Sequence, residues 1–292
     1  MTTIAFAGLG AMGIPMTHNL LKAGYAVHGI DINPQSLKTL ESMGGTPFTD
    51  ASQACQRADI LMILVVNAAQ ARQVLFDSNA LTALPKQSTV CLLSTCPPAD
   101  VEQIHREVAA AGRRFVDCPV SGGVAGATSG TLTVMAACDQ EAFEHVKDVF
   151  NVIGERIFHV GLQPGQGAMC KTINQLLCGL HIAVAAEAFA LAKKSGLNLE
   201  LLLDIMSGSS ASSWMLKDRG PRMLESDPVV TSAVDIFVKD LSIVLQAGRD
   251  AKAALPLTSA AFQLFLASSG RGEGRLDDSQ VIRSYDLLNG MN

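Results

Sequence analysis

A glycine-rich turn between a strand-like and a helix-like segment is the feature that most limits what this chain can fold into. The short apolar run Ile4–Ala7 leads straight into the turn, which reads Gly8-Leu9-Gly10-Ala11-Met12-Gly13. In a G-x-G-x-x-G turn, the first glycine permits the tight bend, the second admits a pyrophosphate close to the backbone, and the third lets the helix pack on the sheet. Alone the pattern is weak, because such glycines often only mark a turn.

The turn belongs to a longer alternation of strand-like and helix-like segments that continues to about residue 160. The predicted strands are Ile4–Ala7, Ala26–Ile30, Ile60–Val66, Val90–Leu93, Arg114–Asp117, Leu132–Ala136 and Ile157–Val160. Strands separated by helices form βαβ crossovers, which build a mainly parallel sheet covered by helices on both faces. We therefore expect residues 1–164 to form a doubly wound α/β domain of the Rossmann type, suited to a dinucleotide.

For the remaining residues, 165–292, the sequence predicts an all-α domain that takes part in oligomer contacts. From Gly167 to about Lys194 the chain is mostly Ala, Leu, Ile and Met without a proline, which indicates a helix that is apolar on almost every face. Such a helix must be buried, so we expect it to link the two domains and to form much of a subunit interface. Five further helical segments follow, separated by Gly, Pro and Ser clusters.

Composition limits the partners of this fold. Only 17% of residues are charged, the formal net charge is −5, and no basic block is present, which argues against nucleic acid. The longest uninterrupted apolar run is Ile60–Val66, and His181 and Glu187 interrupt the apolar helix, so we expect no membrane span.

The N-terminus lacks the basic region of a secretory signal, which favours the cytoplasm. Seven cysteines without a CxxC pair and six histidines without ligand spacing predict no metal site.

Asp31 adds a second dinucleotide signal. It ends the second predicted strand about 20 residues beyond the glycine turn, where an acid binds the ribose hydroxyls. A carboxylate there repels the 2′-phosphate of NADP, and no Arg follows it, so NAD is favoured as the cofactor. The alternative is that Asp31 caps the next helix, although Asn33-Pro34 is the better pair for that role.

Two further segments carry candidate chemistry. The first runs from Asp117 through Ser121, Gly122 and Gly123, and its small residues leave backbone amides free to cradle a carboxylate, although a plain loop fits its composition equally well. The second begins at Gly165 and places Lys171, Asn174 and Gln175 within one turn of a helix. A lysine at the edge of such a helix otherwise extends to water.

Together with Val238-Lys239-Asp240, these motifs in this order resemble the β-hydroxyacid dehydrogenase family, over essentially the whole chain. The family includes enzymes for 3-hydroxyisobutyrate, tartronate semialdehyde and L-threonate. The resemblance implies NAD on the first domain, a small hydroxy acid between the domains, and Lys171 as the catalytic acid/base. Oxidation of an alcohol needs one positioned base and a hydride acceptor, and no metal.

The resemblance also implies roles for the other site residues. Those that bind or orient substrate are Ser121, Gly122, Gly123, Asn174 and Gln175. Those near the cofactor are the turn Gly8 to Gly13, Asp31, Val65, Val66, Asn67, Ser94, Thr95, Lys239 and Asp240. Two alternatives stay open: Ser94 caps the helix after Pro97, and Lys239 is a solvated surface lysine.

Within the family, the stretches around Val65, Trp214 and Lys239 are most similar to the L-threonate branch. Asn174 departs from that branch, in which His is common, and matches the tartronate semialdehyde and 3-hydroxyisobutyrate enzymes. We therefore expect NAD-dependent oxidation of L-threonate or a related four-carbon sugar acid by a homodimer or homotetramer. Tartronate semialdehyde reductase and 3-hydroxyisobutyrate dehydrogenase are the alternatives. A non-catalytic NAD-binding module is an alternative of another class, which Lys171 and the Ser121 loop argue against.

Overall fold

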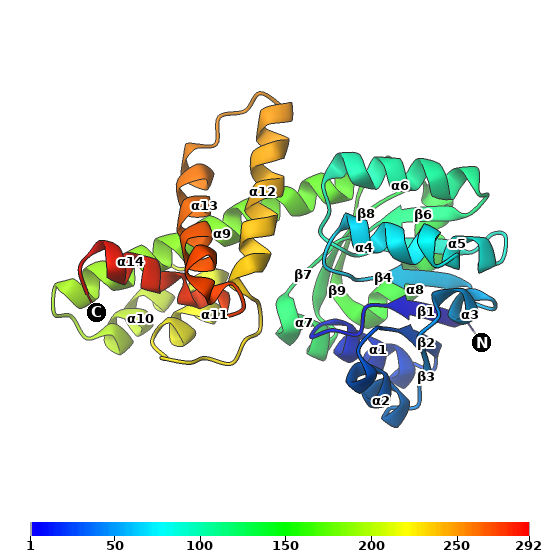
Figure 1. The fold of residues 1–292 in the computed structure, drawn as a ribbon, viewed down its shortest axis with the longest axis horizontal. Helices are drawn as coiled ribbons and strands as arrows, with labels where there is room; N and C mark the ends of the chain where they lie inside the picture. Colours follow the sequence, from blue (N-terminus) through cyan, green and yellow to red (C-terminus); the bar gives the residue numbers. More distant parts are fainter. Residues whose placement is uncertain (1, 292) are drawn as a thin grey trace. The chain divides into compact units, whose positions relative to one another are not determined.

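The computed structural model describes residues 2–291, which divide into two compact units (Figure 1). The first unit runs as far as Lys171 and the second begins at Thr172. The first unit holds a nine-stranded sheet, and the second is built from helices.

The parallel part of the sheet has the order β3-β2-β1-β4-β5-β6. Its strands are β1 (Thr3–Ala7), β2 (Ala26–Ile30), β3 (Thr46–Phe48), β4 (Ile60–Ile63), β5 (Thr89–Leu92) and β6 (Arg114–Asp117). The order reverses between β1 and β4, and ligands of such sheets bind at the carboxyl ends of the strands beside that reversal. The glycine turn follows β1, and Val65 to Asn67 follow β4, so both segments lie at this position.

Three more strands extend the sheet beyond β6. They are β7 (Val120–Ser121), β8 (Leu132–Ala137) and β9 (Gly154–Gly161). β8 runs antiparallel to β6 and β7, whereas β9 runs parallel to β8. The doubly wound parallel sheet expected from the sequence is confirmed in its main part. Strands β3 and β7 were not predicted, because two or three residues are too few to show a periodic pattern.

Helices cover both faces of this sheet. They are α1 (Gly13–Lys22), α2 (Pro34–Ser42), α3 (Ala51–Cys55), α4 (Ala68–Arg72), α5 (Ala80–Ala83), α6 (Pro98–Ala110), α7 (Gly123–Ser129) and α8 (Gln140–Ile153), with the π-helical turn η1 (Gln73–Asp77). Alternate residues of β1 enter different cores: Ile4 and Phe6 pack with α1 and α8, and Ala5 and Ala7 pack with α3 to α6. This alternation is the two-residue period of a strand buried on both faces.

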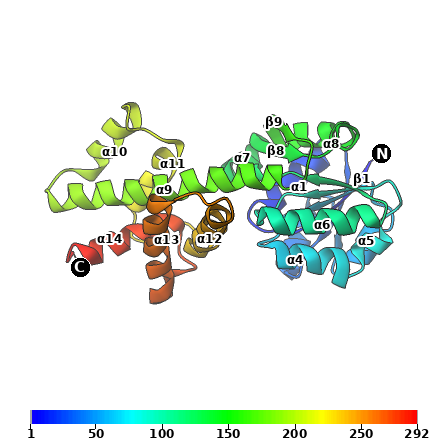
Figure 2. The ribbon, with the colours of Figure 1, turned by 90° about the horizontal axis from the view of Figure 1, so that it is seen from above.

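The second unit contains most of the long helix α9 (Gln166–Lys194) and shorter helices around it (Figure 2). These are α10 (Leu199–Gly208), α11 (Trp214–Met223), α12 (Val234–Asp250), α13 (Pro256–Ser268), η2 (Ser269–Glu273), η3 (Asp278–Val281) and α14 (Ile282–Leu288). Phe189 of α9, Phe237 of α12 and Phe265 of α13 meet in one buried core. The helical second half expected from the sequence is confirmed.

Two findings bear on the expectations about α9. Within a single chain the helix is not buried on every face, since Val184 is 61% exposed and Leu191 is 68% exposed, so its full burial still depends on the predicted subunit interface. His181 and Glu187 also do not remove it as a membrane candidate, because α9 is long and apolar enough to cross a bilayer by length and composition alone. Half of that window is buried within the protein, as in the core helix of a soluble protein, so this finding is weak evidence for a membrane.

Candidate active site

The glycine turn after β1 is closed on one side and open on the other. Gly8 has a φ of +100°, and a Cβ there would lie 2.1 Å from the carbonyl oxygen of Leu64. A Cβ on Gly13 would lie 2.0 Å from the carbonyl oxygen of Gly8, so neither position tolerates a side chain. A Cβ on Gly10, in contrast, would meet nothing within 4 Å. This open side is the space that a pyrophosphate needs.

The groups around this space suit a dinucleotide. Among residues 2–291, no hydrogen bond uses the main-chain N–H groups of Gly10, Ala11 or Met12, which lie where α1 begins and where an anion is favoured. The Asp31 carboxylate accepts from Leu9 N at 2.6 Å and from Asn33 N at 2.7 Å. A carboxylate offers about four acceptor positions, so Asp31 still has capacity for ribose hydroxyls.

The helix-capping alternative for Asp31 was wrong. Asn33 caps α2, because its side-chain oxygen accepts from Gln35 N at 3.0 Å, and Pro34 occupies the first turn. Asp31 instead ties the glycine turn to the end of β2. The residues present therefore fit NAD.

Two side chains hold the loop after β4: Ser94, which follows β5, and Gln70 of α4. Ser94 Oγ accepts from Val65 N at 2.8 Å, and the Gln70 side chain accepts from Val66 N at 3.0 Å. Asn67 caps α4. Ser94 does not cap α6, which begins after Pro97 without a side-chain cap, so that alternative was wrong. Ser94 is 3% exposed, so its hydroxyl fixes the loop that we expect beside the cofactor.

The segment from Ser121 to Gly123 joins β7 to α7 through two unusual conformations. The φ angle is +132° at Gly122 and +61° at Gly123, which disfavours residues with a side chain. A Cβ on Gly122 would lie 3.0 Å from Leu132 Cδ2, whereas the space at Gly123 is open. The half-buried Ser121 precedes this open backbone, an arrangement that suits a carboxylate.

The carboxyl end of β6 holds the start of α9. Asp117 Oδ2 accepts from Gly165 N at 2.8 Å and from Ala168 N at 2.9 Å. Burial raises the pKa of Asp117 to about 6, although the N–H groups of Ala168, Gly165 and Gly167 lower it. Lys171, one turn further along α9, is only 7% exposed. No role was predicted for the Asp117 side chain, although its place at the end of a strand was a signal.

In the second unit, Asp240 joins two of the other predicted site residues. Gln175 Nε2 donates to Asp240 Oδ2 at 2.5 Å, and Lys239 Nζ lies 2.8 Å from Asp240 Oδ1. Gln175 is 8% exposed and Asp240 is 2% exposed. The contact of Lys239 with a buried carboxylate argues against a purely solvated lysine. The close placement of Gln175 and Asp240 could not be read from the sequence, because 65 positions separate them in the chain.

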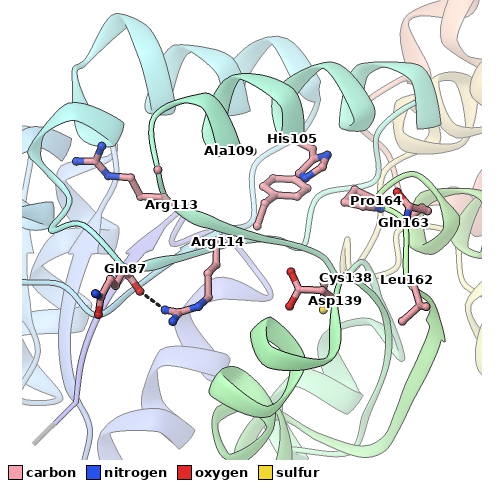
Figure 3. A pocket seen from close by; sticks show the side chains of 12 residues that line it. Gln87, His105, Ala109, Arg113, Arg114, Cys138, Asp139, Leu162, Gln163 and Pro164 are labelled. Atoms are coloured by element: carbon pink, nitrogen blue, oxygen red, sulfur yellow. Dashed lines mark hydrogen bonds between the residues drawn. The ribbon is translucent and has the colours of Figure 1, made fainter.

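A cavity of about 500 Å³ lies in the first unit (Figure 3). None of the predicted site residues lines it. Its two arginines are engaged within the protein: Arg113 donates to the carbonyl of Leu84, and Arg114 donates to Gln87 and Glu141. Asp139, also in its wall, caps α8. The cavity therefore offers no uncommitted arginine to an anionic substrate.

Comparison with known proteins identifies both halves of the chain. A family model described as the NAD binding domain of 6-phosphogluconate dehydrogenase matches residues 3–161. A second, described as the NAD-binding of NADP-dependent 3-hydroxyisobutyrate dehydrogenase, matches residues 165–285.

Individual relatives match over almost the full chain. An L-threonate dehydrogenase of Cupriavidus necator is 41% identical over 97% of this chain and 95% of its own length. A 2-hydroxy-3-oxopropionate reductase of Escherichia coli is 34% identical over 98% of this chain and 97% of its own length. The crystal structure of a 3-hydroxyisobutyrate dehydrogenase from Salmonella typhimurium has a TM-score of 0.93 at 38% identity, with 97% of this chain and 99% of that chain covered. The chain therefore belongs to the β-hydroxyacid dehydrogenase family and is an NAD-dependent enzyme that acts on the CH–OH group of a hydroxy acid.

Proposed function

We propose that this enzyme oxidises L-threonate or a closely related four-carbon sugar acid with NAD. The observation that carries the proposal is the identity of 41% to an L-threonate dehydrogenase over nearly the whole chain, against 34% to the 2-hydroxy-3-oxopropionate reductase. Asn174 favours the alternative substrates, because the resemblance associates Asn with the tartronate semialdehyde and 3-hydroxyisobutyrate enzymes. A 3-hydroxyisobutyrate dehydrogenase activity is the second candidate, and the Salmonella structure supports it.

In this proposal the substrate is held by its carboxylate. The backbone at Gly122 and Gly123, with the Ser121 hydroxyl, binds that anion. Asn174 and Gln175 orient the hydroxyl-bearing carbon, and the bond from Gln175 to Asp240 fixes the amide of Gln175. Thr95, Lys239 and Asp240 lie near the cofactor, together with the turn Gly8 to Gly13, Asp31, Val65 to Asn67 and Ser94.

Lys171 supplies the acid/base step. In the direction of oxidation, Nζ of neutral Lys171 takes the proton of the substrate hydroxyl as the carbonyl forms. In the direction of reduction, the Lys171 ammonium returns that proton. NAD, when bound, supplies the acceptor of the hydride. The low exposure of Lys171 supports this role, because bulk water is largely excluded from the amine that transfers the proton.

We further propose that residues 1–164 bind the cofactor and residues 165–292 bind substrate and make subunit contacts. The exposed side of α9 supports a homodimer or homotetramer, because it presents a line of apolar side chains: Ile173, Leu177, Val184 and Leu191. A cytoplasmic location completes the proposal and is supported by the seven free cysteines, five of them buried.

Formation of reduced nicotinamide with a panel of acids tests the proposed function. The panel is L-threonate, D-erythronate, glycerate, 3-hydroxyisobutyrate and L-serine, each with NAD and with NADP. We expect the highest kcat/KM for L-threonate with NAD. A higher value for 3-hydroxyisobutyrate or glycerate would overturn the substrate and keep the family.

Lys171→Ala tests the catalytic role. Loss of a general base lowers kcat by about 10²- to 10⁴-fold, and binding of NAD, followed by titration calorimetry, stays unchanged. Lys193→Ala is the matched control on the same helix, because Lys193 is exposed and pairs with Asp286 at 3.0 Å. Turnover retained in Lys171→Ala would remove Lys171 from the mechanism.

A further inference from the structure

We propose that Asp117 is a positioning residue for Lys171: its carboxylate fixes the first turn of α9 on the end of β6 and thereby sets where the lysine lies. The inference rests on the proposed catalytic role of Lys171. Asp117, Gly165 to Ala168 and Lys171 all belong to the first compact unit. Asp117 touches neither the substrate nor the cofactor in this proposal, so its effect on the reaction passes through α9.

The bonds of Asp117 act on the part of α9 that determines the position of Lys171. Oδ2 accepts from Gly165 N, just before the helix, and from Ala168 N in its first turn. A helix begins with N–H groups that have no partner within it, and these groups favour a negative charge. Fixing both sides of the helix start restrains its rotation as well as its height above the sheet.

Lys171 lies on the fixed face of the helix. Residues three and four apart are neighbours on a helix, so Lys171 follows Gly167 and Ala168 on one side. A Cβ on Gly167 would lie 2.7 Å from the carbonyl oxygen of Asp117 and 2.6 Å from that of Met135. The backbone of α9 therefore rests directly on β6 and β8 one turn before the lysine.

Burial of the Asp117 carboxylate costs free energy, because the charged group is removed from water. Stability alone therefore does not explain an acid at this position. Asp117 is 1% exposed, and burial raises its pKa. Its Oδ2 bonds come from the backbone N–H groups of Gly165 and Ala168, and neither comes from a cationic side chain. A buried carboxylate held by main-chain groups fixes a backbone segment more strictly than a flexible ion pair would.

The test compares Asp117→Ala, Asp117→Asn and Asp139→Ala in the full-length enzyme. Asp139 is the matched control, because its Oδ1 accepts from Ala142 N at 2.8 Å at the start of α8, which carries no site residue. We expect Asp117→Ala to lower kcat at least tenfold while KM for NAD changes less than twofold. Asp117→Asn, whose amide oxygen can accept from the same two N–H groups, restores most of kcat. Asp139→Ala leaves kcat unchanged.

A second readout does not depend on turnover. Reductive methylation followed by mass spectrometry measures how fast each lysine reacts, and the buried Lys171 reacts slowly in the unaltered protein. In Asp117→Ala we expect Lys171 to react at least fivefold faster, while the exposed Lys147 reacts at its original rate. If Asp117→Ala does not fold, Gly167→Ala replaces it, because the added Cβ displaces the same turn without removing a polar group.

Defined outcomes overturn the inference. A kcat within twofold of the original in the folded Asp117→Ala or Gly167→Ala protein contradicts it, and so does an equal loss in Asp139→Ala. The failure of the proposed function is a separate result, since Lys171→Ala would then retain turnover. An inactive Lys171→Ala with a fully active Asp117→Ala refutes the positioning role alone.

Discussion

Two buried acids, one in each unit of this enzyme, are held in different ways. In the first unit, Asp117 stands at the carboxyl end of β6 and accepts from main-chain N–H groups, as does the half-buried Asp31 at the end of β2. In the second unit, Asp278 accepts two bonds from the Arg219 guanidinium, at 2.8 and 2.9 Å. An acid bonded to main-chain amides fixes a loop or a helix start, whereas an acid paired with arginine joins side chains of separate helices.

Breaking the ion pair of the second unit should give the largest change in stability. Asp278 is fully buried, and Asp278→Ala leaves the nearly buried Arg219 without its bidentate partner. We expect the free energy of unfolding to fall by about 3–5 kcal/mol, measured by urea denaturation. The double replacement Arg219→Met with Asp278→Leu is the control and should recover most of the loss. A fall in kcat of the folded Asp278→Ala protein would contradict the division between the units.

Asp117 of the first unit should instead make the stability of the protein depend on pH. Burial raises the pKa of Asp117 to about 6 in the folded protein, above the ordinary value of a carboxyl. The folded protein therefore binds a proton more tightly than the unfolded chain. The stabilising contribution is fully present below about pH 4 and is lost as the pH rises through about 6.

Asp117→Asn isolates this contribution, because all other titrating groups are shared. From pH 4 to pH 7, the stability of the original protein should fall relative to Asp117→Asn by an amount on the order of 2 kcal/mol. Urea denaturation of both proteins across this range measures the difference. If the free energy of unfolding depends on pH in the same way in both proteins, burial does not raise the pKa of Asp117.

Asp31 should affect the choice of cofactor and not stability. Asp31→Ala removes the proposed acceptor for ribose hydroxyls and frees the N–H of Leu9. We expect KM for NAD to rise about tenfold, which corresponds to about 1.4 kcal/mol. The preference for NAD over NADP should narrow, because the carboxylate that repels the 2′-phosphate is gone. Steady-state kinetics with both cofactors measure the change, and an unaltered preference would contradict the role of Asp31.

An exposed ion pair in the first unit should have the smallest effect. Arg72 donates to both oxygens of Glu107, at 2.8 and 3.1 Å, but both side chains are more than one third exposed. Glu107→Gln should lower the free energy of unfolding by less than about 1 kcal/mol, measured by urea denaturation. A loss as large as that of Asp278→Ala would show that the pairing itself, and not burial, decides how strongly an ion pair stabilises this protein.

Much of the fold follows from local sequence. The apolar run of β1, the glycine turn and Asp31 lie close together in the chain, so their joint purpose could be predicted from spacing. The same holds for Asn33-Pro34 at the start of α2. Strand β7 was missed because two residues carry no period, and β4 ended at Ile63 because the apolar residues after it form the loop.

The sequence by itself determined the Rossmann sheet, the dinucleotide turn, the long apolar helix and the lysine upon it. These features depend on residues within about 30 positions of one another, over which backbone geometry links pattern to structure. Only the tertiary structure decided that Asp117 holds the start of α9, 48 positions away, and that Asp240 binds Gln175, 65 positions away. The physical reason is that such contacts depend on which strand ends and helix faces the packed cores bring together, and local sequence does not encode those distances.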